Sequence, residues 1–242
     1  MVESSRSDTA LVVSFEIKGE TLTTHYEEKS CCGVCGSENE YTGIGSTNSF
    51  GSPDLDTRPP EMRRSTMFAW VQRCPDCGFC SSDVSKSRPG DQLLVNGTDY
   101  KAQLNDLVYP ALANKFLCKA ICDRAAGSYS DATWDFIHAA WACDDSGHAD
   151  QAKVCRKTAA DLLELSQKQG QKVAGQDRAE FAMLVDLLRR SGQITRAKAL
   201  LASKQGGLGD DVIGRVLVFE VALLEKNDVS CHTISEALGE AR

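Results

Sequence analysis

The pattern of apolar and polar positions divides the chain into a strand-forming front part and a helix-forming back part. Residues 13–17 alternate between apolar and polar side chains, which is the period of a strand with one buried face. A turn at 18–20 and a second strand over 21–26 are expected to follow, making a hairpin before the first cysteines. Residues 66–73 alternate as well and predict a strand that leads into the second group of cysteines.

The back part has the periodicity of amphipathic helices and contains no proline after Pro110. Pro110 suits the first turn of a helix, and Gly127 suits its end. Residues 85–97 are rich in polar residues and predict a linker between the two parts. The predicted helices cover residues 110–126, a segment around 134–141, 148–169, 178–190, 194–202 and a segment around 213–224, and residues 229–241 close the chain.

Two tight turns divide the back part into helical hairpins. Gly147 precedes Ala152 by five residues, as Gly192 precedes Ala197, and each small residue lets the second helix approach the first. The turns lie 45 residues apart (192 minus 147), which resembles tetratricopeptide (TPR) repeats in outline, although the consensus W-x₂-L-G-x₂-Y is absent. A plain helical bundle would have the same periodicity, so both arrangements stay open.

Six of the eleven cysteines lie in two groups whose spacing is typical of metal ligands. Residues 31–36 read CCGVCG and residues 74–80 read CPDCGFC, so each group contains the motif CxxCG. Two residues between the thiolates let both sulfurs reach one ion at about 2.3 Å, and the glycine that follows tolerates a positive φ. Four thiolates close a tetrahedral site, the arrangement of structural zinc. The predicted metal ligands are Cys32, Cys35, Cys74 and Cys77.

The same four thiolates could hold iron as in rubredoxin, because soft thiolate sites select only weakly between the two metals. Zinc is the predicted ion, and iron with a role in electron transfer is the alternative. Cys31 and Cys80 extend the motifs toward those of iron–sulfur proteins, but the ferredoxin pattern needs a further x₃-C-P, which does not follow Cys80. Both are interpreted as additional thiols close to the metal.

Few other residues suggest chemistry. Cys118 and Cys122 are four apart on a predicted helix and are expected to be buried free thiols. His138 shares a helix face with two tryptophans and is expected to be a core residue.

Residues 54–64 (DLDTRPPEMRR) combine carboxylates and guanidinium groups. They form either a binding surface for a polar or anionic partner or a long loop that Asp56 and Arg58 fix against the metal site by hydrogen bonds to the backbone. Because no nucleophile is paired with a base, no catalytic residue is predicted.

Composition and charge limit the classes of partner. Lysine and arginine number 27 and acidic residues 34, so the net charge is −7. This balance argues against nucleic-acid binding, which depends on neutralising phosphates with lysine and arginine. No apolar run approaches the roughly 20 residues of a membrane helix, and no export signal is evident. We therefore expect a cytoplasmic protein without membrane contact, in which cysteines stay reduced.

In order, the segments CGVCG, DLDTRPPEMRR, WVQRCPDCGF, HAAWACDDSG and LLRRSGQITRAKAL resemble a bacterial family classified as a domain of unknown function. Its members have two CPxCG-type zinc motifs, a D-x-RP loop between them and TPR-like helices, and the resemblance covers about residues 30–240. Gly33 stands here in place of the usual proline and Phe79 in place of tyrosine, and neither is a ligand. The resemblance implies the same four cysteine ligands and implies no activity.

These features together predict an α+β protein with two domains. Residues 1–90 are expected to form a zinc-ribbon-like β module, and residues 91–242 an all-α, TPR-like domain. The expected function is a zinc-binding, non-enzymatic scaffold or adaptor whose helical groove binds a protein or peptide partner. The alternative is a rubredoxin-like iron–thiolate protein that transfers electrons.

Overall fold

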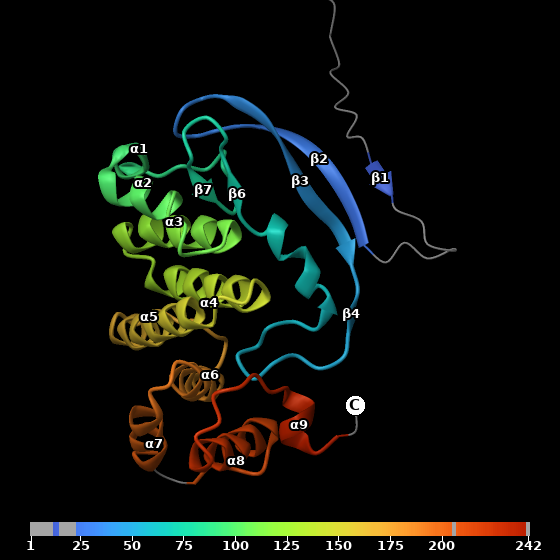
Figure 1. The fold of residues 1–242 in the computed structure, drawn as a ribbon, viewed down its shortest axis with the longest axis vertical. Coiled ribbons are helices and arrows are strands. Elements are labelled where there is room, and N and C mark those ends of the chain that lie inside the picture. The colour runs from blue at the N-terminus through green and yellow to red at the C-terminus, as the bar shows by residue number, and fades with distance from the viewer. Residues whose placement is uncertain (1–11, 15–22, 205–206, 241–242) are drawn as a thin grey trace, which may run out of the picture.

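The computed structural model describes residues 12–14, 23–204 and 207–240. Figure 1 shows a stack of helices with a long, bent β-hairpin beside it. The order of elements, strands first and helices afterwards, is that of the predicted α+β class. Residues 15–22, with the predicted turn at 18–20, lie outside the described residues.

The two cysteine motifs occupy the turns of two β-hairpins. The strands are β2 (Thr23–Cys31) and β3 (Glu38–Thr47) for the first hairpin, and β6 (Gln72–Arg73) and β7 (Cys80–Ser81) for the second. Cys31 lies opposite Glu38 in the first ladder, and Arg73 lies opposite Cys80 in the second. Each motif is therefore the connection between two paired strands. β1 (Val12–Ser14) pairs antiparallel with β2, which confirms the start of the predicted N-terminal hairpin.

The chain between the two hairpins is mostly irregular. Its elements are β4 (Ser49–Phe50), β5 (Glu61–Met62) and the 3-10 helix η1 (Arg64–Ala69). The prediction of a strand over 66–73 is therefore wrong over residues 66–71. Thr66 Oγ1 accepts a hydrogen bond from Trp70 Nε1 at 3.0 Å, a contact between residues four apart that an extended strand would not allow. Only the last two residues of the predicted strand are extended.

The chain from residue 91 onward is helical. Its helices are α1 (Asp91–Asn96), α2 (Thr98–Leu104), α3 (Ala111–Ala125), α4 (Tyr129–Asp145), α5 (Ala149–Lys168), α6 (Asp177–Arg190), α7 (Ile194–Ala202), α8 (Val212–Glu225) and α9 (Ile234–Leu238). The predicted linker over 85–97 is wrong from residue 91, because α1 and α2 bury Val95 and Tyr100. None of the described helices is both long and apolar enough to cross a membrane.

Tight turns of one type join α3 to α4, α4 to α5 and α6 to α7. Gly147 and Gly192 have φ values of 74° and 80°, a region that glycine adopts without strain. The N–H of His148 donates to the carbonyl of Cys143 at 2.8 Å, and an equivalent bond follows Gly192. This Schellman motif ends one helix and reverses the chain. From α3 to α9, each helix contacts the next one in sequence.

One hydrophobic core runs through both parts of the described chain. It includes Phe79 of the second hairpin, Tyr100 of α2 and Trp141 of α4. The Tyr100 hydroxyl accepts a hydrogen bond from the N–H of Cys80 at 2.9 Å and donates one to the carbonyl of Gly78 at 3.1 Å. The second hairpin turn is thereby held directly against the helices.

Candidate metal centre

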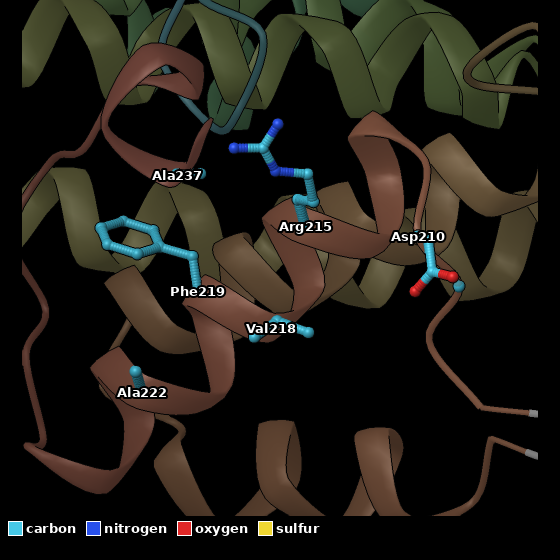
Figure 2. Close-up of a pocket in the computed structure, with 7 residues that line it drawn as sticks. Asp210, Arg215, Val218, Phe219, Ala222 and Ala237 are labelled. Carbon is cyan, nitrogen blue, oxygen red and sulfur yellow. The ribbon is translucent and has the colours of Figure 1, made fainter. Parts of the chain in front are cut away.

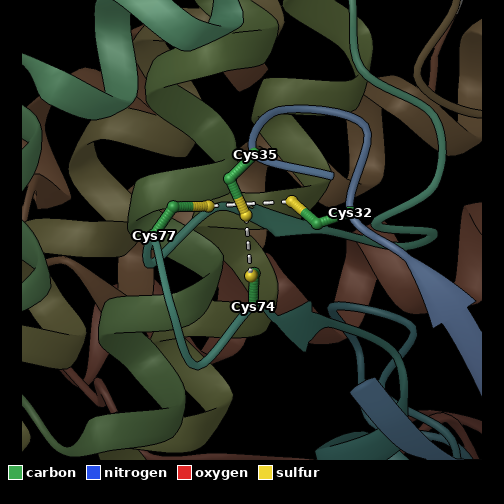
Figure 3. A group of neighbouring side chains, drawn as sticks. All are labelled: Cys32, Cys35, Cys74 and Cys77. Atoms are coloured by element: carbon green, nitrogen blue, oxygen red, sulfur yellow. Dashed lines mark hydrogen bonds between the residues drawn. The ribbon is translucent and has the colours of Figure 1, made fainter. Parts of the chain in front are cut away.

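The four predicted ligand cysteines meet in one cluster. Figure 3 shows the side chains of Cys32 and Cys35 facing those of Cys74 and Cys77. The Sγ atoms of Cys32 and Cys77 lie 3.6 Å apart, as do those of Cys35 and Cys74, and all four lie within 4.8 Å of one another. Four sulfurs bound tetrahedrally to zinc at about 2.3 Å would be about 3.8 Å apart. The spacing of the cluster therefore fits a single four-coordinate ion.

The two motifs have the same backbone conformation. In the first, the N–H of Gly36 donates to the carbonyl of Cys32 at 2.7 Å, and the N–H of Cys32 donates to the carbonyl five residues ahead at 2.9 Å. In the second, Gly78 and Cys74 make the same two bonds at 2.9 and 2.8 Å. The glycines have φ values of 76° and 82°, which explains why a glycine follows each CxxC.

Ser37 is a residue of the site that the cysteine spacing did not predict. Its Oγ lies 3.0 Å from the Sγ of Cys35 and 3.4 Å from the Sγ of Cys74, and it accepts a hydrogen bond from Asn39 at 3.3 Å. One hydroxyl thus joins a sulfur of each motif, and a hydroxyl that donates to a thiolate stabilises its charge. The second motif has Phe79 at the equivalent position, so the sequence contained no signal for this contact.

The four thiols differ in acidity. Ser37 lowers the pKa of Cys35 through its hydroxyl. Burial by itself would raise the pKa of Cys74, but the backbone N–H of Cys77 and the Ser37 hydroxyl outweigh it and lower this pKa to about 6. Burial raises the pKa of Cys32 and of Cys77. One thiol of each motif therefore has a pKa below that of an ordinary cysteine, and a bound cation would favour the thiolate form at all four.

The other predicted thiols lie outside this cluster. Cys31 is exposed, Cys80 is buried, and neither belongs to the group of four. Cys118 and Cys122 are buried in α3 as expected, and Cys118 Sγ lies 3.8 Å from the carbonyl oxygen of Tyr100. Within the described part of the chain, no second group of three or more cysteine, histidine or acidic side chains has metal-ligand spacing.

His138 is confirmed as a core residue. Its ring lies between 5.0 and 5.8 Å, centroid to centroid, from the rings of Trp70, Phe116, Trp134 and Trp141. Burial lowers its pKa to about 3, so the ring is neutral at pH 7. A neutral ring packed among four aromatic rings serves the core rather than a metal.

The loop over residues 54–64 is fixed by the helices. Asp56 is fully buried, and its Oδ2 accepts hydrogen bonds from Trp141 Nε1 at 2.8 Å and from Arg190 Nη1 at 2.5 Å. Arg58 donates to an aspartate at the end of α4 at 2.5 Å. The interpretation that these side chains fix the loop is confirmed in part, because Asp56 Oδ1 accepts a hydrogen bond from the backbone N–H of Arg58 at 3.3 Å. The loop is held against α4 and α6, however, and not against the metal site.

Comparison of the chain with protein-family models, with curated proteins and with solved structures gave no match. The family resemblance drawn from the motifs is therefore supported only in its coarse layout. That layout is a four-cysteine cluster carried by β-hairpins and followed by a helical region.

Proposed function

We propose that Cys32, Cys35, Cys74 and Cys77 bind one zinc ion and that this ion is structural. The observation that carries the proposal is the grouping of four sulfurs within 4.8 Å of one another. Four thiolates fill every position of a tetrahedral ion, so no position stays open for water or a substrate. Structural zinc sites have this composition, whereas catalytic sites keep one position free.

The zinc ion would connect two chain segments that are far apart in sequence. Its ligands come from the turn between β2 and β3 and from the turn between β6 and β7. The zinc binding energy of such sites is roughly 10–16 kcal/mol, comparable to or larger than the stability of a whole domain. We therefore expect the hairpins to depend on the ion for their fold.

A pair of cysteine variants tests the structural role. Cys74→Ser should lose the zinc and part of the β-type circular dichroism, because Cys74 is a buried ligand. Cys31→Ser should keep the zinc, because Cys31 is exposed and outside the cluster. Complete zinc removal by a chelator that left the circular dichroism and the unfolding midpoint unchanged would contradict the structural role.

We also propose that the helical region binds a protein or peptide partner, without enzymatic activity. A hollow of about 510 Å³ at α8 and α9 supports this proposal. Figure 2 shows its lining, which includes Val218, Phe219, Ala222 and Ala237, with Asp210 and Arg215 also present. An apolar hollow with charged residues beside it suits an apolar side chain of a peptide segment. In this proposal, the consecutive helical hairpins act as a TPR-like scaffold for the peptide.

Two matched valine variants test the partner site. Val218 on α8 is 57% exposed and lines the hollow, whereas Val154 on α5 is 53% exposed and lies outside it. A protein that co-purifies with the wild-type chain should be lost with Val218→Glu and retained with Val154→Glu. Equal retention by both variants would place the partner elsewhere on the chain or refute partner binding by this hollow.

Iron in place of zinc is the second candidate. Cys35 is exposed, so an ion at the cluster would lie close to the surface, as electron transfer requires. Four thiolates accept iron as well as zinc. A red protein with thiolate-to-iron absorption bands would favour this function, and a colourless zinc protein would contradict it.

A further inference from the structure

A second hollow, of about 510 Å³, lies where the loop over residues 54–64 meets the start of α5 and residues 229–231. Its lining is unusually rich in cations for a chain with a net charge of −7. The lining contains the cations Arg58, Arg64, Lys153, Arg156 and Arg190 and the two carboxylates of Asp54 and Asp144. Three further carboxylates, those of Asp56, Asp145 and Asp150, pair with these cations from outside the lining. None of these groups belongs to the cysteine cluster.

Three of these arginines are buried and incompletely hydrogen-bonded. Arg58, Arg156 and Arg190 are 5%, 2% and 7% exposed. Arg156 binds both carboxylate oxygens of Asp144, and Arg190 bridges from Asp144 to Asp56. The Nε–H of each of the three arginines has no hydrogen-bond partner among the described residues. These Nε atoms are themselves buried, so they leave the three guanidinium groups incompletely compensated and offer no donor to the hollow.

The two arginines of the loop also have free donors. Arg58 donates through Nη2 to Asp145, and Arg64 donates through Nη2 to Asp54 and through Nε to the carbonyl of Pro59. Within the described residues, neither Nη1 group makes a hydrogen bond. The guanidinium groups of Arg58 and Arg64 therefore each keep Nη1–H donors that are available to a ligand in the hollow.

The start of α5 adds backbone donors to the same hollow. Ala149 lines it, and α5 has no side chain bonded to its first turn. In the described chain, the N–H groups of residues 149–151 have no acceptor, and the first helical bond is that of Ala152. The aligned peptide dipoles of a helix of 20 residues favour an anion at this end. Lys153 lies one turn further along, with Asp150 as its ion-pair partner.

We propose that this hollow binds a phosphate group. The donors come from two different segments, the loop over residues 54–64 and the start of α5, and a tetrahedral phosphate has enough oxygens to accept from both. A planar carboxylate would satisfy one guanidinium fork and leave the remaining donors unused. Arginine forks combined with a helix N-terminus are the chemistry by which proteins recognise phosphate.

Asp144 and Asp54 are the carboxylates in the lining that oppose an anion, and Asp54 is the more deeply buried of the two. The Oδ2 of Asp54 has no hydrogen-bond partner among the described residues, and burial raises its pKa, so part of its negative charge is removed as the pH falls toward that pKa. Its other oxygen accepts the hydrogen bond from Arg64.

Titration calorimetry on the full chain at fixed ionic strength tests the proposal, with inorganic phosphate, glycerol phosphate and acetate as probes. Phosphate should bind saturably, and acetate should bind at least about tenfold more weakly. If glycerol phosphate binds more tightly than inorganic phosphate, the natural ligand is an organic phosphate; if the affinities are equal, it is phosphate itself. Both of these outcomes support the site.

A matched pair of lysines on α5 provides the control. Lys153 lines the hollow, whereas Lys157 lies one turn further on and pairs with Asp161 outside it. Lys153→Gln should weaken phosphate binding by about tenfold, and Lys157→Gln should leave it unchanged. Arg58→Lys keeps the charge but removes the fork, and it should also weaken binding. Absence of saturable phosphate binding, equal affinity for acetate, or equal weakening by both lysine variants would overturn the proposal.

Discussion

Replacing Asp56 by alanine should destabilise the protein far more than removing a surface carboxylate. Asp56 lies in the loop between the two cysteine motifs and is fully buried against the helices. Its Oδ2 accepts hydrogen bonds from Trp141 at 2.8 Å and Arg190 at 2.5 Å, and Arg156 Nη2 lies 3.8 Å from the same oxygen. Without this carboxylate, two buried guanidinium groups would have only Asp144 as an acid partner.

The magnitude follows from this uncompensated charge. Removing one partner of a buried ion pair costs about 3–5 kcal/mol of unfolding free energy, because the other charge stays buried. The Trp141 hydrogen bond belongs to the same network, so its loss is not simply added to that figure. Asp161 pairs with Lys157 and Arg196 at the surface, with its side chain 45% exposed. Asp161→Ala should therefore cost about 1 kcal/mol or less.

Urea unfolding of both variants, followed by tryptophan fluorescence, measures this difference. The pH dependence gives a second readout with a defined sign. Burial opposes ionisation of Asp56, but Arg190 and Arg156 outweigh it and lower its pKa. Its contribution is therefore present at neutral pH and is lost as the pH falls below the ordinary range of an aspartate. A cost for Asp56→Ala equal to that of Asp161→Ala, or an unchanged acid sensitivity, would refute the reasoning.

Three further predictions concern other parts of the fold. Gly36→Ala should cost about 1–2 kcal/mol through its positive φ alone, whereas Gly78→Ala should cost more in urea unfolding, because its Cβ would lie 2.5 Å from Leu104 Cδ2. Glu220 and Asp186 are buried carboxyl groups that both pair with the buried Arg189. Burial raises the pKa of Glu220 to about 9. Stability should fall as the pH rises toward 9, and Glu220→Gln should remove that fall in unfolding midpoints measured at neutral and alkaline pH. His138 has its pKa lowered to about 3 by burial, so stability should fall as the pH drops below about 6.5. His138→Phe should reduce this loss in thermal unfolding at mildly acidic pH.

The sequence predicted the features that depend on local spacing. Two CxxCG motifs force each cysteine pair into a tight turn, so the spacing alone was enough to assign the four sulfurs to one cluster. Glycines followed by the start of another apolar repeat predicted the helical turns at Gly147 and Gly192. In both cases the information lies within a few neighbouring residues.

The features that depend on contacts over long sequence separations could not be predicted. The helix over 91–96 is short and follows Pro89 and Gly90, so its composition resembled a linker, although Val95 is fully buried. Residues 66–69 alternate like a strand, but they lie in a 3-10 helix that buries Thr66 and Met67. The partners of Asp56 lie 85 and 134 residues away along the chain. No local pattern identifies such partners.

Elemental analysis with a visible spectrum, on protein purified without added metal, is the sharpest test of the cysteine centre. We expect one zinc per chain, no visible absorption, and loss of the zinc in Cys74→Ser but not in Cys31→Ser. One iron per chain with thiolate charge-transfer bands would contradict the structural zinc assignment. A chain that folds with no metal at all would contradict the claim that the four cysteines form a metal site.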